Sequence, residues 1–347
     1  MSNPHDLVHA SVTLQISKGV TDAWTKGREE RERREEKKRE KKKMKKKRER
    51  ERPLSSEPER EPERAANVMS DSSLIVVEHL RMNEEDSSSS SNGGGGGGGG
   101  ALVALVSLNR PSAFNALTYD MLSQLAHVFK TLGTREEVRA AILTGKGDAF
   151  SAGIDLTAAS QVFSRDEESE RENDVVRQMD KCRFPIIGAI NGPAVTAGFE
   201  IALACDILVA SSSAFFMDTH CKFGIMPGWG LSQKLPRLIG INRAREVAFT
   251  SRRLSAREAK ETGLVSHVYE TREELLEGAL GIARRIGRNS KATVENYKKV
   301  LTEGYGMTYD DARELERRTA WAHYRKMDPD HFSKLAKFIQ SKRKAKL

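Results

Sequence analysis

The carboxylate of Glu200 stands at the expected start of a helix, which makes it the first candidate for chemistry. Residues 186–190 form an apolar run with β-branched members, which predicts a buried strand, and this run meets the turn Asn191-Gly192-Pro193. A helix is expected from about Ala197. The amides of a first helical turn have no acceptor within the helix and attract developing negative charge. Glu200 lies in that turn, where a carboxylate also suits the helix dipole. This segment alone therefore leaves a catalytic role and a purely stabilising role open.

A second segment of the same type precedes the first. Residues 140–145 are expected to form a strand, and residues 147–156 a loop with the sequence Gly-Asp-Ala-Phe-Ser-Ala-Gly-Ile-Asp-Leu. Three further motifs are Asn109-Arg110-Pro111, Asn115-Ala116-Leu117 and, in residues 224–230, Gly-Ile-Met-Pro-Gly-Trp-Gly. In this order and spacing the set resembles the crotonase family, the enoyl-CoA hydratases and isomerases, and in particular the monofunctional peroxisomal hydratases of plants. The resemblance covers roughly residues 72–347.

The resemblance implies an α/β fold, a crotonase-like spiral of repeated β-β-α units with a C-terminal helical region that builds a trimer or a dimer of trimers. We therefore expect the spiral core in residues 69–273 and the trimerisation region in residues 274–347, where the apolar spacing becomes helical. Strands are expected at residues 74–80 and 101–108, joined by a Ser/Gly-rich insertion at residues 87–100 that contains eight consecutive glycines.

Matched residue by residue to the family's motifs, the oxyanion hole falls on the backbone amides of Ile154 and Ala197. In the family these amides hold the thioester oxygen of an acyl-CoA. Polarising that carbonyl makes the β-carbon electrophilic, and losing one such donor typically slows a reaction roughly a hundred- to a thousand-fold. The predicted contacts with substrate and CoA are made by Arg110, Ala152, Gly153, Asp155, Leu156 and Lys298, with the basic cluster Lys342-Arg343-Lys344 as a further partner of the CoA phosphates. CoA is part of the substrate, so no cofactor and no metal are expected.

The position twenty residues after Glu200 departs from the family's hydratase pattern. Hydratases of the family use two glutamates around one water; Glu200 matches the first, and His220 replaces the second. A histidine with its ordinary pKa of roughly 6.5 leaves a neutral ring that can hold or relay a proton near neutral pH. Asp218 could orient this ring, or Asp218 and His220 could form a polar turn at the rim of the pocket.

These residues predict an enoyl-CoA hydratase of fatty-acid β-oxidation, which adds water to trans-2-enoyl-CoA and yields 3-hydroxyacyl-CoA. In this hypothesis Glu200 deprotonates the attacking water, and His220 positions that water or helps to return a proton to the α-carbon. One alternative is a 3,2-enoyl-CoA isomerase, which moves a double bond with one carboxylate and tolerates loss of the second. Another is a non-catalytic crotonase-like binding module with a basic nucleic-acid-binding arm.

Residues 1–68 differ in composition from the rest of the chain. They hold 20 Lys plus Arg and 14 Asp plus Glu, of 58 and 49 in all 347 residues. Between residues 25 and 52 the only apolar side chain is Met44, so no face could pack a core or a coiled coil. We expect a charged, disordered extension, absent from the working protein if translation begins at Met69. Its charged run has no interleaved aromatic residues to stack on bases, so nucleic acid is not the expected partner.

Several other classes lack their signatures. The glycine run matches Gly-x-Gly-x-x-Gly but opens no helix, so NAD binding is not expected, and no Gly-x-Ser-x-Gly elbow of a serine hydrolase occurs. The cysteines, Cys182, Cys205 and Cys221, are too few and irregular for a disulfide framework or a zinc site. No run approaches the roughly 20 apolar residues of a membrane span, so membrane insertion is not expected.

The C-terminal tripeptide Ala345-Lys346-Leu347 resembles the Ser-Lys-Leu peroxisomal address. An enzyme of fatty acyl-CoA breakdown fits that compartment. We therefore expect a peroxisomal location and recognition of the tripeptide by the peroxisomal import receptor.

Overall fold

A six-stranded sheet forms the framework of the protein. The computed structural model describes residues 73–82, 100–163, 173–333, 336–337 and 340, all within the unit Arg64–Leu347. The strands follow the order β1 (Ile75–Arg81), β2 (Leu102–Leu108), β3 (Val138–Gly145), β4 (Ile186–Ile190), β6 (Ile207–Ser211) and β9 (His267–Tyr269). Strand β1 is antiparallel to β2, as the predicted hairpin requires, and all other neighbours are parallel.

Three short strands form a second, smaller sheet. It contains β5 (Ala194–Val195), β7 (Phe215–Met217) and β8 (Arg253–Ser255), and the bridges Leu117–Ile154 and Ser151–Ala194 extend its pattern. After β4, for example, the chain passes through β5 into α7 (Ala197–Leu203). The structure therefore confirms the predicted α/β fold with strand-strand-helix units, although no sequence repeat reveals them.

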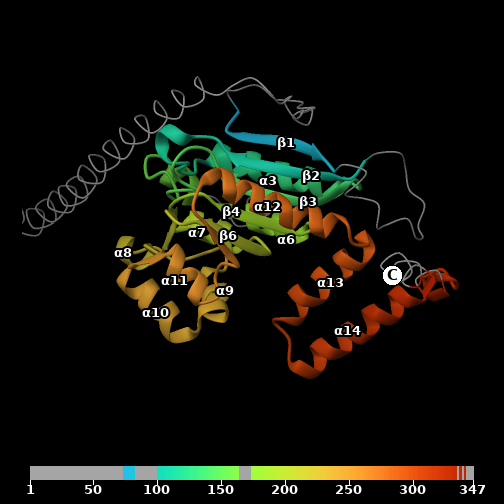
Figure 1. Cartoon of the computed structure of the whole chain (residues 1–347). Coiled ribbons are helices and arrows are strands. Elements are labelled where there is room, and N and C mark those ends of the chain that lie inside the picture. The colour runs from blue at the N-terminus through green and yellow to red at the C-terminus, as the bar shows by residue number, and fades with distance from the viewer. Residues whose placement is uncertain (1–72, 83–99, 164–172, 334–335, 338–339, 341–347) are drawn as a thin grey trace, which may run out of the picture. The chain divides into compact units, whose positions relative to one another are not determined.

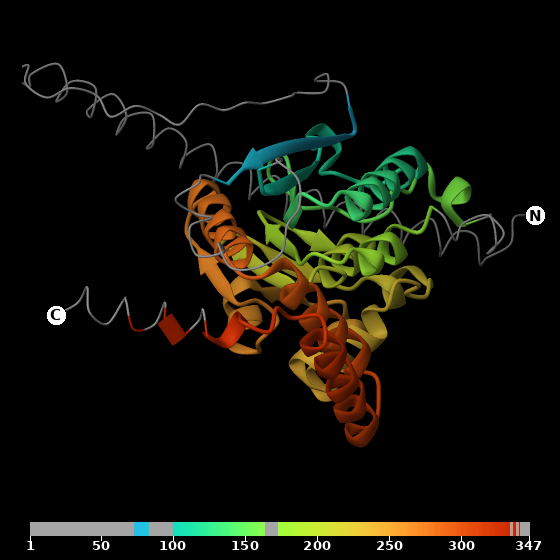
Figure 2. The same ribbon diagram turned by 90° about the vertical axis from the view of Figure 1, so that its right-hand side faces the viewer.

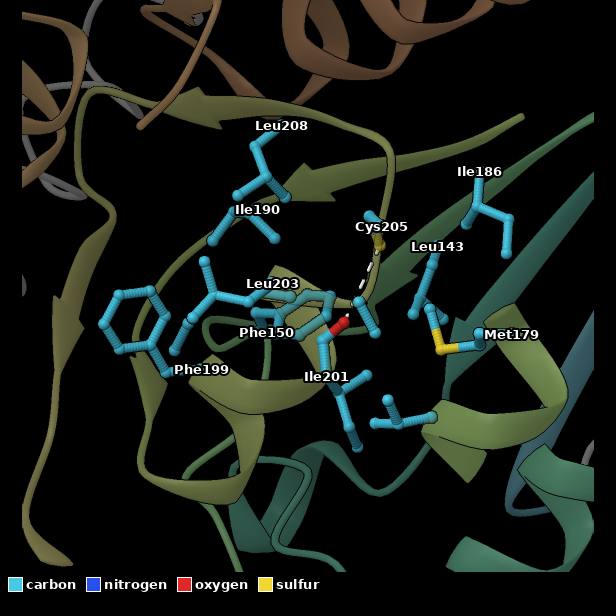
Figure 3. Packing of buried hydrophobic residues seen from close by; sticks show 14 of the residues in the cluster. Leu143, Phe150, Met179, Ile186, Ile190, Phe199, Ile201, Leu203, Cys205 and Leu208 are labelled. Carbon is cyan, nitrogen blue, oxygen red and sulfur yellow. Dashed lines mark hydrogen bonds between the residues drawn. The ribbon is translucent and has the colours of Figure 1, made fainter. Parts of the chain in front are cut away.

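Helices cover both faces of the main sheet, so its central strands are apolar throughout and not alternating. On one face, α3 (Tyr119–Thr134), α6 (Val175–Lys181) and α7 pack against the side chains of Leu143, Ile186 and Ile190. Figure 3 shows Phe199, Ile201 and Leu203 of α7 within this cluster. On the other face, α12 (Arg272–Gly287) buries Leu275, Ala279 and Ile282 against β3, β4 and β6.

Several other helices complete the described structure. They are η1 (Pro111–Ala113), α4 (Ala159–Phe163), α8 (His220–Phe223), α9 (Leu231–Ile239), α10 (Ile241–Thr250), α11 (Ala256–Glu261), α13 (Lys291–Gly304) and α14 (Tyr309–Tyr324). Helices α13 and α14 pack on each other (Figures 1 and 2), and neither has a buried residue.

The predicted boundary at residue 274 falls within α12, whose apolar face is buried against the sheet. After α12, neither α13 nor α14 has a buried residue. The assignment of residues 274–347 to a trimerisation region stays a prediction. No helix among the described residues is long and apolar enough to span a membrane. The predicted extension at residues 1–68, the insertion up to residue 99 and the segment 341–347 lie outside the described residues.

Candidate active site

Two loops at the carboxyl ends of β3 and β4 lie against each other and bring Ile154 and Ala197 together. The amide of Ser151 donates to Pro193 O at 3.0 Å, and that of Val195 donates to Ser151 O at 2.9 Å. A β-carbon on Gly153 would lie 3.7 Å from the Ala197 nitrogen and 2.9 Å from Val195 O. Gly153 also has a φ of +93°, so only glycine fits this close approach. Among the described residues, neither the Ile154 amide nor the Ala197 amide donates a hydrogen bond.

Two buried asparagines hold the first loop in place. The Asn115 amide donates to Lys146 O at 2.9 Å and to Ala149 O at 2.8 Å, while the Asn191 amide donates to Gly147 O at 2.9 Å. From α12, Arg272 donates to the carbonyl oxygens of Gly145 and Gly147, both at 2.8 Å. Sequence analysis missed Arg272, because no local motif links it to Gly147, 125 residues away in the chain.

The Glu200 side chain lies in the first turn of α7 and is 3% exposed. Its Oε1 accepts a hydrogen bond from the Trp229 amide at 2.8 Å, and its Oε2 lies 3.5 Å from His220 Nε2. The Thr196 amide donates a hydrogen bond to Met217 O at 2.8 Å. This bond holds the start of α7 beside β7, the strand that leads to His220. The structure therefore brings the two predicted catalytic side chains face to face.

Asp218 is the other partner of His220. Its Oδ1 lies 2.6 Å from His220 Nδ1 and also accepts the His220 backbone amide at 3.0 Å. Asp218 is 2% exposed and His220 is 4% exposed, so the pair lies inside the site and not in a polar turn at its rim. Burial lowers the pKa of His220, but hydrogen bonds from the ring to Asp218 and Glu200 outweigh burial and raise the pKa to about 9. The expectation of a neutral ring at neutral pH is therefore wrong, because two carboxylates stabilise the imidazolium.

Comparison with known proteins identifies the family. The family described as "Enoyl-CoA hydratase/isomerase" matches residues 98–344. This chain belongs to that family. A relative from Arabidopsis thaliana, named "Probable enoyl-CoA hydratase 1, peroxisomal", is 48% identical over 237 residues, which cover 68% of this chain and 89% of the relative. Another Arabidopsis relative, "Delta(3,5)-Delta(2,4)-dienoyl-CoA isomerase, peroxisomal", is 35% identical over 208 residues, 56% of this chain and 75% of the relative.

Solved structures of the family share the fold. The crystal structure of an enoyl-CoA hydratase from Bacillus anthracis is 33% identical in sequence and superposes with a TM-score of 0.62, over 69% of this chain and 93% of that one. A putative enoyl-CoA hydratase from Streptomyces coelicolor, 28% identical, gives a TM-score of 0.64 over 84% of this chain and 97% of that one.

Most of the residues predicted to contact substrate or CoA surround the Ile154 amide. Arg110 donates to Asp155 Oδ2 at 2.6 Å and to Ala116 O at 3.0 Å, which ties the loop after β2 to the loop after β3. Hydrogen bonds from Thr157 and Arg110 lower the pKa of Asp155 to about 2, so it is ionised at neutral pH. Ala152 and Leu156 are exposed on either side of Ile154, where a ligand could reach them.

Lys298 is not part of this group. Its ammonium donates to Asp206 Oδ2 at 2.8 Å and to Phe184 O at 3.0 Å, and these acceptors precede β6 and β4. In this chain Lys298 therefore lies at the amino ends of the parallel strands, whereas Glu200 and Ile154 follow their carboxyl ends. The ion pair fastens α13 to the core, and the predicted contact of Lys298 with CoA stays a prediction.

The cysteines have no part in the arrangement. All three are free, and burial raises the pKa of the Cys182 thiol to about 12. Within the described ranges, no group of three or more His, Cys, Asp or Glu side chains could hold a metal ion.

Proposed function

We propose that the protein is an enoyl-CoA hydratase that adds water to trans-2-enoyl-CoA and forms 3-hydroxyacyl-CoA, as in fatty-acid β-oxidation. The observation that carries the proposal is the buried contact between Glu200 and His220, whose Oε2 and Nε2 atoms lie 3.5 Å apart. The proposal also uses the amides of Ile154 and Ala197, neither of which donates a hydrogen bond within the described part of the chain. The hydratase names among the relatives support the same reaction.

The amides of Ile154 and Ala197 would bind the thioester oxygen of the substrate. Two such donors polarise the carbonyl, draw electron density from the β-carbon and stabilise the enolate that follows. Ala197 is the first residue of α7, where an amide has no intrahelical acceptor and the helix dipole favours negative charge. CoA enters as part of the substrate, so this reaction requires no cofactor.

Glu200 would take up the proton that the attacking water loses, and His220 would supply the proton that the α-carbon gains. The Glu200 carboxylate takes a proton from water as the water oxygen bonds to the β-carbon. The His220 imidazolium gives its Nε2 proton to the α-carbon, which collapses the enolate to the thioester. The proton then on Glu200 returns to His220 across their contact, so each group regains its starting state and the sum is one water added.

Asp218 would keep His220 in the form that this mechanism needs. Its carboxylate binds Nδ1, which leaves Nε2 directed at Glu200 and stabilises the positive charge of the ring. A neutral histidine at this position would have one proton fewer to give to the α-carbon.

Isomerisation of 3-enoyl-CoA is the second candidate. Glu200 alone could move a proton between two carbons, and a relative named as a dienoyl-CoA isomerase supports this chemistry in the family. The buried trio of ionisable groups argues against a mere binding module, because burying charges is costly unless they are paired. A nucleic-acid-binding arm would lie in residues 1–68, outside the described part of the chain.

The proposed assembly is a homotrimer or a dimer of trimers. Helices α13 and α14 expose large apolar side chains that a second subunit could cover: Tyr297, Leu301, Tyr305, Tyr309, Trp321 and Tyr324. The proposed location is the peroxisome, with Ala345-Lys346-Leu347 bound by the import receptor. The peroxisomal name of the Arabidopsis relative supports that location.

Product analysis of the purified full chain tests the function. Incubation with a trans-2-enoyl-CoA should give 3-hydroxyacyl-CoA, resolved by chromatography, while a 3-enoyl-CoA should remain unchanged. Conversion of the 3-enoyl substrate to its 2-enoyl isomer without hydration would make the protein an isomerase. No turnover of either substrate would contradict both enzymatic proposals.

A further inference from the structure

Thr196 has a backbone conformation that its side chain disfavours. Its φ is 51° and its ψ is −112°, although threonine is β-branched and 7% exposed here. Glycine is the residue that such a conformation favours, and strain of this kind costs on the order of 1–3 kcal/mol. A glycine at this position would remove the strain, but it would also lack the threonine hydroxyl.

The groups of Thr196 contact each part of the candidate site. Its carbonyl accepts the Glu200 amide at 3.0 Å, and its peptide link to the next residue carries the Ala197 amide. A β-carbon on Gly153 would lie 3.5 Å from the Thr196 Cβ, so the threonine packs beside the residue that precedes Ile154. Thr196 thus lies between the two predicted oxyanion donors.

The Thr196 hydroxyl is hydrogen-bonded to the hydroxyl of Thr219. Thr219 is 5% exposed and occupies the position before α8, so its backbone leads directly into His220. This bond joins the turn that carries Ala197 to the turn that carries Asp218 and His220. A glycine at position 196 would relax the backbone but lose the connection.

We infer that Thr196 and Thr219 are positioning residues, whose hydroxyl pair fixes the Ala197 amide and the His220 ring relative to each other. This inference rests on the proposed hydratase function. Neither hydroxyl exchanges protons with the substrate. Their effect comes through geometry, because displacing catalytic groups by about 1 Å can slow a reaction on the order of a hundredfold.

The test compares Thr196→Gly, Thr196→Ser, Thr219→Val and Thr219→Ser in the full chain. The two variants without the hydroxyl should lower kcat for 2-enoyl-CoA hydration by about tenfold to a hundredfold, with KM changed less than about threefold. The two serine variants, which keep the hydroxyl, should restore kcat to within about threefold of wild type. A double variant, Thr196→Gly with Thr219→Val, should lose no more than the worse single variant, because both remove one interaction.

Ser251 provides a matched control for the backbone change. It also has a positive φ, 52°, is 8% exposed, and its hydroxyl has no hydrogen-bond partner among the described residues. Ser251→Gly should also relieve a positive φ, with a smaller release of strain because the Ser251 ψ of 32° lies in the allowed left-handed region, and it should leave kcat unchanged. The melting temperature of Thr196→Gly should stay within a few degrees of wild type, as for Ser251→Gly.

Two results would overturn the inference while the hydratase function stands. One is a Thr196→Gly or Thr219→Val protein with kcat within about threefold of an active wild type. The other is a loss of kcat that the serine variants do not reverse. If Thr196→Gly does not fold, Thr219→Val and Thr219→Ser decide the question. An inactive wild type would contradict the proposed function and this inference together.

Discussion

The single residue on which the proposed chemistry depends most is His220, because its protonation state is set by its neighbours. Asp218 and Glu200 lie on opposite sides of the ring, at 2.6 Å from Nδ1 and 3.5 Å from Nε2. With a pKa raised to about 9, the ring carries its second proton at neutral pH. In the proposed mechanism this is the proton that His220 donates to the α-carbon.

Asp218→Asn tests this electrostatic account. The pKa of His220 should fall, because the side chain that most stabilises its imidazolium would lose its charge. In the wild type, kcat should decline as the pH rises through about 9, and in the variant this decline should begin at lower pH. The kcat–pH profiles of both proteins measure the shift. Asp180→Asn, at an exposed carboxylate on α6, is the control and should leave the profile unchanged. Superimposable Asp218→Asn and wild-type profiles would contradict the account.

The same pKa makes stability depend on pH. His220 binds its proton more tightly in the folded state, about 9 against roughly 6.5 for an unfolded chain. Its stabilising contribution is therefore complete below about pH 6.5 and is lost as the pH rises through about 9. The melting temperature of wild type should exceed that of His220→Gln most near pH 6.5, and the difference should shrink by pH 9.5. A difference that stays constant over this range would show that His220 is not an imidazolium in the folded protein.

From the sequence alone, only those site residues that belong to local motifs could be predicted. Glu200, Ile154, Ala197 and His220 stand at fixed places in such motifs. The pKa of His220 and the hydroxyl pair of Thr196 and Thr219 depend on distances between segments that fold together. The ion pair of Lys298 with Asp206 could not be predicted for the same reason, because it joins residues 92 apart in the chain.

At the scale of elements, strands and helices with regular apolar patterns were the easiest to predict. The predicted strand at residues 186–190 and the helix start at Ala197 match β4 and α7. The two-residue strand β5 could not be predicted, since it exists only through its pairing with β7. The packing of α12 on the sheet could not be predicted, because an amphipathic pattern shows that a face is buried but not which surface covers it.

Asn191→Ala should disturb the loop that leads to the Ile154 amide. Asn191 accepts the Gly145 amide at 2.9 Å and donates to Gly147 O at 2.9 Å, so alanine would leave the buried Gly145 amide unpaired and remove one tie to the loop. We expect a loss of about 2 to 4 kcal/mol in the free energy of unfolding, measured by urea denaturation, and a lower kcat. Asn173→Ala, which removes one partly buried bond to the Tyr119 hydroxyl, should cost less than about 1 kcal/mol. Equal losses in the two variants would contradict the role assigned to Asn191.

At the scale of the whole molecule, α13 and α14 expose large apolar side chains. Leu301 is 63% exposed and Trp321 is 57% exposed in the single chain. Exposed apolar surface is typical of interfaces when it forms a large patch, which supports the proposed assembly. The proposed trimer gives these helices the packing partner that the sheet gives α12.

Light scattering of the purified protein measures the assembly. The mass should be three or six times the 38.6 kDa of one chain, and Leu301→Glu with Trp321→Glu should lower it, because each places a charge in the interface. Arg285→Glu introduces the same side chain at an exposed position of α12 and should leave the mass unchanged. A wild-type protein with the mass of a single chain would contradict the proposed assembly.

The most direct test of the central claim is the rate of 2-enoyl-CoA hydration by Glu200→Gln. Glutamine keeps the size and the hydrogen bond from Trp229 but cannot take a proton from water, so kcat should fall at least about a thousandfold while the melting temperature stays near that of wild type. Glu246→Gln, at a partly exposed carboxylate on α10, should remain fully active. A folded Glu200→Gln protein that hydrates the substrate at close to the wild-type rate would contradict the account.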